Sequence, residues 1–275
     1  MTQLLFQVDA FTAEPFAGNP AAVCLLDADA DPGWMRRVAA EMNLSETAFL
    51  RPGGAAGRYG LRWFTPTVEV ELCGHATLAS AHVLWSEGLA PPGRPLRFDS
   101  AGGPLAARPG DGGAIWLDFP ATPAAPVDPP GGLLAALGGG PARWVGLGRL
   151  DWLVELEDEA AVRGLTPDVG RLAGLGSRGV IVTAAASEAS GGYDFVSRYF
   201  APGVGIDEDP VTGAAHCALG PFWAGRLGRG ELTGFQASAR GGLVQVRPAA
   251  DRVLLGGRAV TVLRGRLVTA GSRPA

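Results

Sequence analysis

The stretch RYFAPGVGIDEDPVTGAA, residues 198–215, repeats the pattern of an earlier stretch, RWFTPTVEVELCG, residues 62–74, at a constant spacing of 136 residues. Arginine, phenylalanine and proline recur at matching positions, and branched aliphatic residues follow the proline in both. A spacing close to half of a 275-residue chain indicates internal duplication. The sequence therefore predicts two similar domains, and in this alignment Cys73 falls opposite Asp209.

Each copy of the pattern changes its hydrophobic period at the same place. Residues 61–72 are rich in aromatic and β-branched side chains, with alternating valines, which predicts a strand. Residues 74–88 then carry apolar residues at helical spacing and end on a glycine. In the second copy, 197–206 is the predicted strand, and Asp209 followed by proline is the predicted helix start.

The rest of the chain contains more strand patterns than helix patterns. Helices are expected over 32–42, with Asp31 as N-cap, and over 158–163. Because the helices do not alternate regularly with strands, the predicted class is α+β, with two pseudo-symmetric domains, each a mostly antiparallel sheet or barrel around a central helix. The further strands are expected over 4–10, 20–26, 47–51, 95–99, 115–119, 152–157, 179–184, 243–247, 253–255 and 259–264.

A segment dense in proline and glycine, 120–143, separates the two copies. Proline fixes φ and glycine loosens the chain, so the segment is interpreted as an inter-domain linker with one short helix. The domains are expected over 1–120 and 121–275, with the extreme C-terminus packing back on the first.

Composition excludes several classes of protein. Hydrophobic residues at 47% and charged residues at 18% indicate a globular chain with a substantial core, and a net charge of −4 argues against a nucleic-acid partner. No apolar run approaches the ~18 residues of a membrane span, and the N-terminus lacks the features of a signal peptide. Three cysteines fit a reduced protein without a disulfide framework. We expect a cytoplasmic protein that binds neither membranes nor nucleic acid.

Cofactor signals are missing or misplaced. All 23 basic residues are arginine, which excludes pyridoxal-phosphate enzymes and lysine aldolases because both need a lysine nucleophile. A lone G-x-G-x-x-G at residues 174–179 precedes a predicted strand, whereas a dinucleotide fingerprint follows one. His75 and His82 lie two helical turns apart, but no further ligand completes a set at metal-binding spacing. The expectation is no metal and no cofactor.

Four ordered motifs carry a resemblance to a known family. They are VDAFTAEPFAGNPAAVCLL (8–26), EMNLSETAFL (41–50), ELCGHATLASAHVL (71–84) and DEDPVTGAAHCALGPFWA (207–224). Together they resemble the PhzF family of phenazine-biosynthesis-like isomerases, relatives of diaminopimelate epimerase, from residue 8 to about 265. The resemblance implies the two-domain fold, an active site in the cleft between the domains, a homodimer, and cofactor-independent proton transfer on a small carboxylate-bearing substrate.

The resemblance also assigns roles to residues. It implies that Glu46 of the SETAF motif is the general acid/base and that His75 and Asp209 line the site. Backbone N–H groups at the two predicted helix starts would bind the substrate anion. The family serine of TGSA is alanine here, so a substrate-binding hydroxyl is missing. The implied anion-binding positions are Gly74, His75, Gly213 and Ala214.

The residues also have plainer interpretations. On spacing alone, Glu46 is a solvated residue at a turn and Asp209 is a helix cap. A two-thiol epimerase mechanism is rejected, because the repeat places Asp209 opposite Cys73 and puts Cys217 deeper in the helix. Cys73 is expected to be a small half-buried residue that lines the pocket. Asn19 is expected to be a turn residue, or one that lines the cleft.

The leading hypothesis is an isomerase in which Glu46 removes a proton beside an activating group and returns it elsewhere on the same face of the substrate. One alternative is a racemase or epimerase of a small amino or hydroxy acid. Another is a catalytically inactive binding protein, which the alanine at 214 favours.

Overall fold

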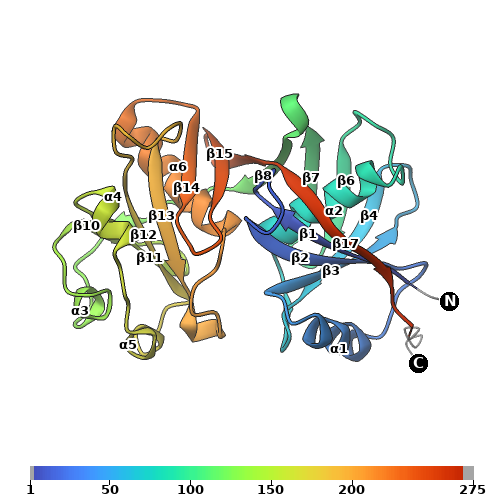
Figure 1. The fold of residues 1–275 in the computed structure, drawn as a ribbon, viewed down its shortest axis with the longest axis horizontal. Coiled ribbons are helices and arrows are strands. Elements are labelled where there is room, and N and C mark those ends of the chain that lie inside the picture. The colour runs from blue at the N-terminus through green and yellow to red at the C-terminus, as the bar shows by residue number, and fades with distance from the viewer. Residues whose placement is uncertain (1–2, 269–275) are drawn as a thin grey trace. The chain divides into compact units, whose positions relative to one another are not determined.

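The computed structural model describes residues 3–268, which divide into two compact units (Figure 1). Unit 1 contains the residues up to Asp118 together with the segment from Gly256 onward, and unit 2 contains Phe119–Leu255. The last strand, β17 (Ala259–Arg266), pairs antiparallel with β1 (Leu4–Ala10), so the C-terminal segment packs on the N-terminal residues. The share of the chain that returns to unit 1 is larger than expected, and residues 1–2 and 269–275 of the expected domains lie outside the described residues.

Unit 1 is a curved sheet that surrounds a buried helix. Its strands pair in the order β17, β1, β2, β3, β4, β6, β7, β8, with β2–β3 and β4–β6 parallel and the other pairs antiparallel. The elements are β2 (Asn19–Leu25), α1 (Pro32–Met42), β3 (Glu46–Pro52), β4 (Arg58–Phe64), β5 (Glu69–Val70), α2 (Gly74–Ser86), β6 (Leu96–Ser100), β7 (Gly103–Pro109), a 3-10 turn (Asp111–Gly113) and β8 (Ile115–Pro120).

The helices of unit 1 follow from local sequence. Helix α1 begins where Asp31 accepts a hydrogen bond from the backbone N–H of Trp34 at 2.8 Å, and it ends at Asn43 in the left-handed conformation. Helix α2 is apolar on all sides, as expected for a helix buried within a sheet, and it packs against β1, β2, β3 and β17.

Unit 2 repeats this arrangement. Its strands pair in the order β9 to β15, with β11–β12 and β13–β14 parallel and the other pairs antiparallel. The elements are β9 (Ala125–Pro126), α3 (Leu133–Ala136), β10 (Ala142–Leu147), β11 (Asp151–Leu156), α4 (Glu159–Arg163), α5 (Val169–Ala173), β12 (Gly179–Ala185), β13 (Phe195–Phe200), a 3-10 turn (Pro202–Val204), α6 (Gly213–Leu227), β14 (Leu232–Gln236), β15 (Gly242–Ala249) and β16 (Arg252–Gly257).

The two units share one topology. From β1 to β7 and from β10 to β15, successive partners run antiparallel, parallel, antiparallel, parallel and antiparallel. In each unit the long helix directly precedes the fifth strand of this series: α2 precedes β6, and α6 precedes β14. The predicted α+β class and the internal duplication are confirmed.

Three boundaries predicted for the repeated segments are wrong. The strand predicted over 61–72 ends at Phe64, because a turn through Thr65 leads into the short partner strand β5, and β13 likewise ends at Phe200. Helix α6 begins at Gly213 with Thr212 as N-cap, so Asp209 and its proline lie before the helix. The two helix starts, Gly74 and Gly213, are 139 residues apart rather than 136. The residue equivalent to Cys73 is therefore Thr212, and the pairing with Asp209 is corrected.

The segment 120–143 packs as part of unit 2. It contains β9 and the expected short helix, α3, whose Leu133 and Ala136 are buried in a core with Val154 and Val182. Tertiary burial therefore overrides its high proline and glycine content. Four further elements, α5, β7, β10 and β14, were not predicted from the sequence.

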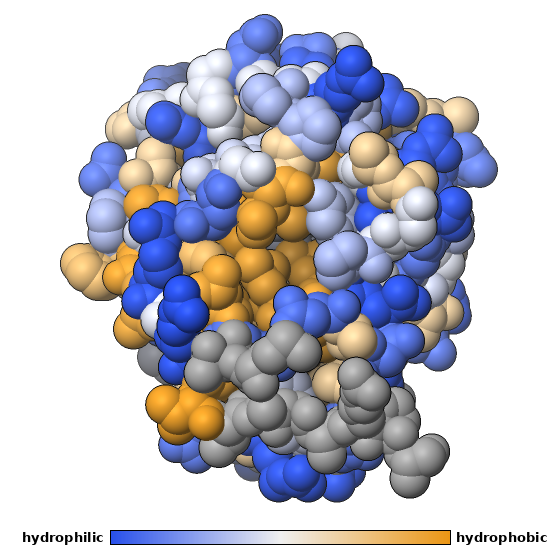
Figure 2. All heavy atoms as spheres, turned by 90° about the vertical axis from the view of Figure 1, so that its right-hand side faces the viewer, coloured by the Kyte–Doolittle hydropathy of each residue, from blue (hydrophilic) through white to orange (hydrophobic). Residues whose placement is uncertain are grey.

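An apolar hollow of about 700 Å³ opens on one face of unit 1 (Figure 2). Its lining includes Leu25, Leu50, Tyr59, Leu84 and Leu89. These residues lie at the C-terminal ends of β2, β3 and α2 or just beyond, except for Tyr59 at the start of β4. Among residues 3–268, no helix combines the length and apolar character that crossing a membrane requires.

Candidate active site

Three side chains from separate elements of unit 1 meet where those elements begin. Asn19 opens β2, Glu46 opens β3 and His75 is the second residue of α2. Strands β2 and β3 are parallel and paired with Ala21 opposite Glu46, which brings their first residues to the same end of the sheet. The Glu46 carboxylate (Oε2) lies 3.4 Å from Nε2 of His75, so two predicted site residues are neighbours.

This cluster is largely shielded from water. The side chains of His75 and Glu46 are 5% and 13% exposed, and Asn19 is fully buried. Burial lowers the pKa of His75 to about 3, so the imidazole is neutral at physiological pH. Asn19 is the first residue of β2 rather than a turn residue, and its amide Nδ2 lies 3.2 Å from Nδ1 of His75.

Cys73 is the N-cap of α2 and is buried. Its Sγ lies 3.6 Å from Nδ1 of His75, and one donor atom each from Cys73, His75 and Glu46 lie within 4.8 Å of one another. The structure thus supplies a set of three possible metal ligands that spacing did not indicate. His75 turns one ring nitrogen toward Cys73 and the other toward Glu46, which suits proton transfer better than chelation of a single ion. His82, by contrast, contacts Thr261 of β17 at 3.0 Å.

A second thiol is missing at the equivalent position of unit 2. The N-cap of α6 is Thr212, and Cys217 is buried in the body of the helix, where burial raises its pKa to about 12. The reason given for rejecting a two-thiol mechanism is corrected, because the residue equivalent to Cys73 is Thr212 rather than Asp209.

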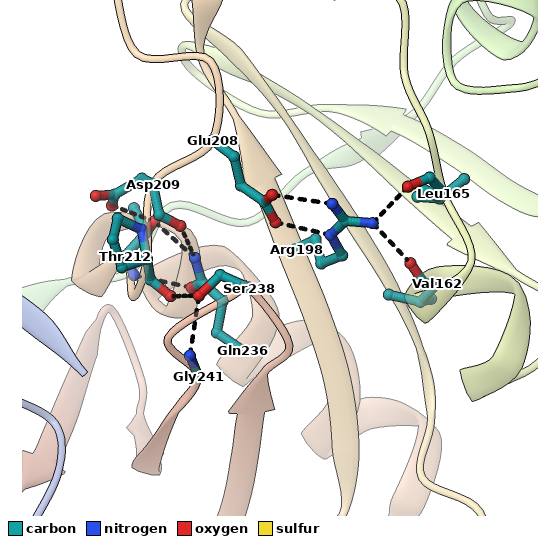
Figure 3. A network of polar contacts seen from close by, with 10 residues as sticks. Val162, Leu165, Arg198, Glu208, Asp209, Thr212, Gln236, Ser238 and Gly241 are labelled. Atoms are coloured by element: carbon teal, nitrogen blue, oxygen red, sulfur yellow. Dashed lines mark hydrogen bonds and ion pairs between the residues drawn. The ribbon is translucent and has the colours of Figure 1, made fainter. Parts of the chain in front are cut away.

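In unit 2 the three acidic residues before α6 lie in different environments, and Figure 3 shows two of them, Glu208 and Asp209. Asp207 is exposed, whereas Glu208 forms a bidentate ion pair with Arg198 at 2.7 and 2.9 Å. Arg198 also donates to the backbone carbonyl of Leu165 at 2.7 Å. Asp209 is buried and accepts a hydrogen bond from the hydroxyl of Thr212. Glu208 and Asp209 thus have separate partners, and Asp207 faces solvent, so the three carboxylates are not forced into one environment.

A buried amide, Gln236 at the end of β14, organises the start of α6 (Figure 3). Its Oε1 accepts from the backbone N–H of Thr212 at 2.8 Å. Its Nε2 donates to the backbone carbonyl of Asp209 at 2.7 Å and to the Thr212 hydroxyl at 3.1 Å. Ser238 donates to the carbonyl of Pro210 at 2.8 Å. Asp209 is thus held by its backbone as well as by its side chain.

The first residues of the two long helices are Gly74 in α2 and Gly213 in α6. N–H groups in the first turn of a helix have no partner within the helix, so both starts offer donors to an anion. Ala214 is half-buried at the second position of α6, where α2 carries His75.

Thr212 and Gln236 were not predicted as site residues from the sequence. Thr212 carried a usable signal, because threonine directly before a glycine and an apolar helical run is a favourable N-cap. Gln236 carried none, since its partners lie 24 and 27 residues away.

Known proteins resemble the whole chain. A family model described as phenazine biosynthesis-like protein (PhzC-PhzF) matches residues 8–265. An uncharacterized isomerase of Halalkalibacterium halodurans is 48% identical, with 98% of this chain and 99% of that protein covered. A human phenazine biosynthesis-like domain-containing protein is 40% identical, with 96% and 98% covered. A crystal structure of an Enterococcus faecalis PhzF-family protein matches with a TM-score of 0.91 at 41% identity, covering 98% of this chain and all of that one. The structure of a probable proline racemase from Agrobacterium radiobacter shares the fold, with a TM-score of 0.64 at 13% identity. The match covers 98% of this chain and 93% of that one.

Proposed function

This chain belongs to the phenazine biosynthesis-like (PhzC-PhzF) family, and we propose that it is an isomerase that moves a proton within a small carboxylate-bearing substrate without a cofactor. The observation that carries the proposal is the pairing of Glu46 with a neutral, buried His75 at the start of a helix. A shielded carboxylate beside a neutral hydrogen-bonding partner suits general acid/base catalysis.

In the proposed reaction Glu46 is the base and then the acid. Its carboxylate takes a proton from a carbon beside an activating group, and the electron pair of the broken C–H bond passes into the adjoining unsaturated system. Glu46 then gives the same proton to another carbon on the same face of the substrate, which moves the double bond. No net redox change occurs, so no electron-transferring cofactor is needed.

The helix starts are proposed as the anion-binding elements. N–H groups at Gly74 and His75 would bind the substrate carboxylate and stabilise the negative charge that develops as the proton leaves. Gly213 and Ala214 at the start of α6 offer the same kind of donor, and Asp209 is proposed to line that part of the site. Cys73 is proposed as a lining residue of the site rather than as a base.

The experiment starts with a thermal-shift screen of small unsaturated amino and hydroxy acids. Each stabilising compound is then incubated in D₂O with the enzyme and followed by NMR. We expect a shifted double bond and a Glu46→Gln variant that still binds the compound but turns it over at least about 100-fold more slowly. Glu41→Gln, at an exposed glutamate of α1, is the matched control. Full turnover by Glu46→Gln would refute the assignment.

The same experiment separates the alternatives. An epimerase would exchange deuterium at one stereocentre and invert it without moving a double bond. A catalytically inactive binding protein would show stabilisation without conversion, and Glu46→Gln would leave its ligand binding intact. A homodimer in the cytoplasm is part of the proposal, and analytical ultracentrifugation of the purified protein tests the dimer.

A further inference from the structure

A chain of polar contacts runs behind the Glu46–His75 pair. The hydroxyl of Ser45 donates to Oδ1 of Asn19 at 3.3 Å, and Nδ2 of Asn19 contacts Nδ1 of His75 at 3.2 Å. Nε2 of His75 then faces the Glu46 carboxylate at 3.4 Å. The chain starts and ends on adjacent residues, Ser45 and Glu46, and passes through a fully buried amide.

This chain determines which nitrogen of His75 carries hydrogen. Oδ1 of an asparagine only accepts hydrogen bonds and Nδ2 only donates them. In the structure Oδ1 of Asn19 faces the Ser45 hydroxyl, which donates to it, and Nδ2 faces the ring, so Nδ1 of His75 must accept. The Cys73 thiol, 3.6 Å from the same nitrogen, is compatible with this state, because a thiol can donate to Nδ1. A neutral imidazole that accepts at Nδ1 carries its hydrogen on Nε2.

We propose that Asn19 is a positioning residue that holds His75 as the Nε2–H tautomer, with that hydrogen aimed at the Glu46 carboxylate. The use of this arrangement rests on the proposed function, since an N–H donor favours the carboxylate form that removes a proton. The opposite tautomer would turn a lone pair toward the carboxylate and repel it.

The state of Nε2 supports this inference. Within residues 3–268, no group satisfies hydrogen-bond geometry with Nε2 of His75, although the atom is buried. Glu46 at 3.4 Å is its neighbouring acceptor. A buried donor just short of a full hydrogen bond gains when its neighbour carries negative charge, which is the state of Glu46 before it takes up the proton.

The tautomer can be measured without a substrate. The chain contains only three histidines, so ¹⁵N-histidine labelling and long-range ¹H–¹⁵N NMR at pH 7.5 resolve each ring. We expect Nε2–H at His75. His216 is an internal reference of opposite kind, because its Nδ1 contacts the carbonyl of Thr212 at 2.8 Å and must carry hydrogen there. His75→Gln and His216→Gln assign the signals.

Asn19→Asp provides the decisive change. A carboxylate at this position can only accept, so His75 should move its hydrogen to Nδ1 while His216 stays unchanged. Ser45→Ala removes the donor to Oδ1 of Asn19, so the amide can turn over and both tautomers of His75 should be populated. This variant introduces no buried charge. Nδ1–H at His75 in the wild-type protein, or an unchanged tautomer in both variants, would overturn the proposal.

The outcome is independent of the catalytic assignment. Should His75 show the expected tautomer while Glu46→Gln retains turnover, the proposed function fails and the positioning role of Asn19 stands. Conversely, loss of turnover in Glu46→Gln with Nδ1–H in the wild type leaves the function and removes the inference.

Discussion

The starts of α2 and α6 are equivalent in the duplicated fold, but their buried amides have different partners. In unit 1, Asn19 contacts the ring of His75, whose other ring nitrogen faces the Glu46 carboxylate. In unit 2, Gln236 binds the backbone on both sides of the loop before α6. One copy therefore keeps a titratable pair at the helix start, whereas the other uses its polar groups to hold the chain in place.

The two copies also share an arginine that is placed alike and used differently. Arg62 in β4 and Arg198 in β13 each form a bidentate ion pair with a glutamate and lie over the phenylalanine two residues on. Arg62 and Glu69 are each about one-third exposed, whereas Arg198 is 13% exposed and also binds backbone carbonyls. The equivalent arginine therefore forms a partly exposed ion pair in unit 1, whereas in unit 2 it also fixes the backbone near Leu165.

The largest expected effect on stability is at Gln236. Gln236→Ala leaves the N–H of Thr212 and the carbonyl of Asp209 buried without this partner. Each such group costs about 1–3 kcal/mol, so the free energy of unfolding should fall by about 3 kcal/mol or more. Urea denaturation measures it, and Gln245→Ala, at an exposed glutamine of β15, should stay within about 0.5 kcal/mol of wild type. Equal losses for the two variants would remove the anchoring role.

The second prediction concerns one histidine from each unit. Burial lowers the pKa of His75 to about 3 and that of His216 to about 4, while the unfolded imidazoles titrate near 6.5. Below pH 6.5 the unfolded chain therefore binds protons that the folded chain does not. The free energy of unfolding should fall as the pH drops from 7.5 to 5, by about 2 kcal/mol for each histidine.

Denaturation at several pH values tests this slope. His216→Asn should reduce this fall by about 2 kcal/mol, whatever its stability at pH 7.5. A free energy of unfolding that stays flat or rises on acidification would contradict the buried, neutral state of both rings.

The third prediction compares the two arginines. Arg198→Ala strands Glu208 and removes a donor from the carbonyl of Leu165, so it should destabilise by about 2 kcal/mol. Arg62→Ala removes a pair that is about one-third exposed and should cost about 1 kcal/mol or less. Double-mutant cycles with Glu208→Gln and Glu69→Gln isolate the pair energies. A stronger coupling for Arg62 would invert the comparison.

The smallest effect is expected at Ala214, the α6 counterpart of His75. Ala214→Ser restores the hydroxyl of the family pattern and should change stability by no more than about 0.5 kcal/mol. If α6 takes part in anion binding, the affinity for a carboxylate found in the screen should rise about 2–10-fold by calorimetry. Ala224→Ser, near the other end of α6, is the control and should leave affinity unchanged. Identical affinities in both variants would argue against a binding role for the start of α6.

Sequence reasoning succeeded where the signal is local. Asp31 followed by proline predicted the start of α1, and the Asp31–Trp34 hydrogen bond confirms it. Alternating and continuous apolar runs predicted most strands, and the 136-residue repeat predicted the duplication. Glu46 and His75 were singled out by motif, and the structure places them side by side.

Prediction from the sequence failed where extra residues shifted the repeat or where a side chain packs against residues far along the chain. A constant spacing placed Asp209 opposite Cys73, but three extra residues between β13 and α6 make Thr212 the equivalent residue. The segment 120–143 resembled a linker because proline and glycine predict local flexibility, yet Leu133 and Ala136 are drawn into the core of unit 2.

The order of residues established the class of fold, the repeat and most helices and strands, because periodicity and capping act over a few neighbouring residues. Only the tertiary structure decided two sets of contacts, those of Asn19 with His75 and those of Gln236 with the loop before α6. Each joins residues that are 24 to 56 positions apart in the sequence. Hydrogen bonds of this kind depend on how strands and helices are placed in space, and no local pattern encodes that placement.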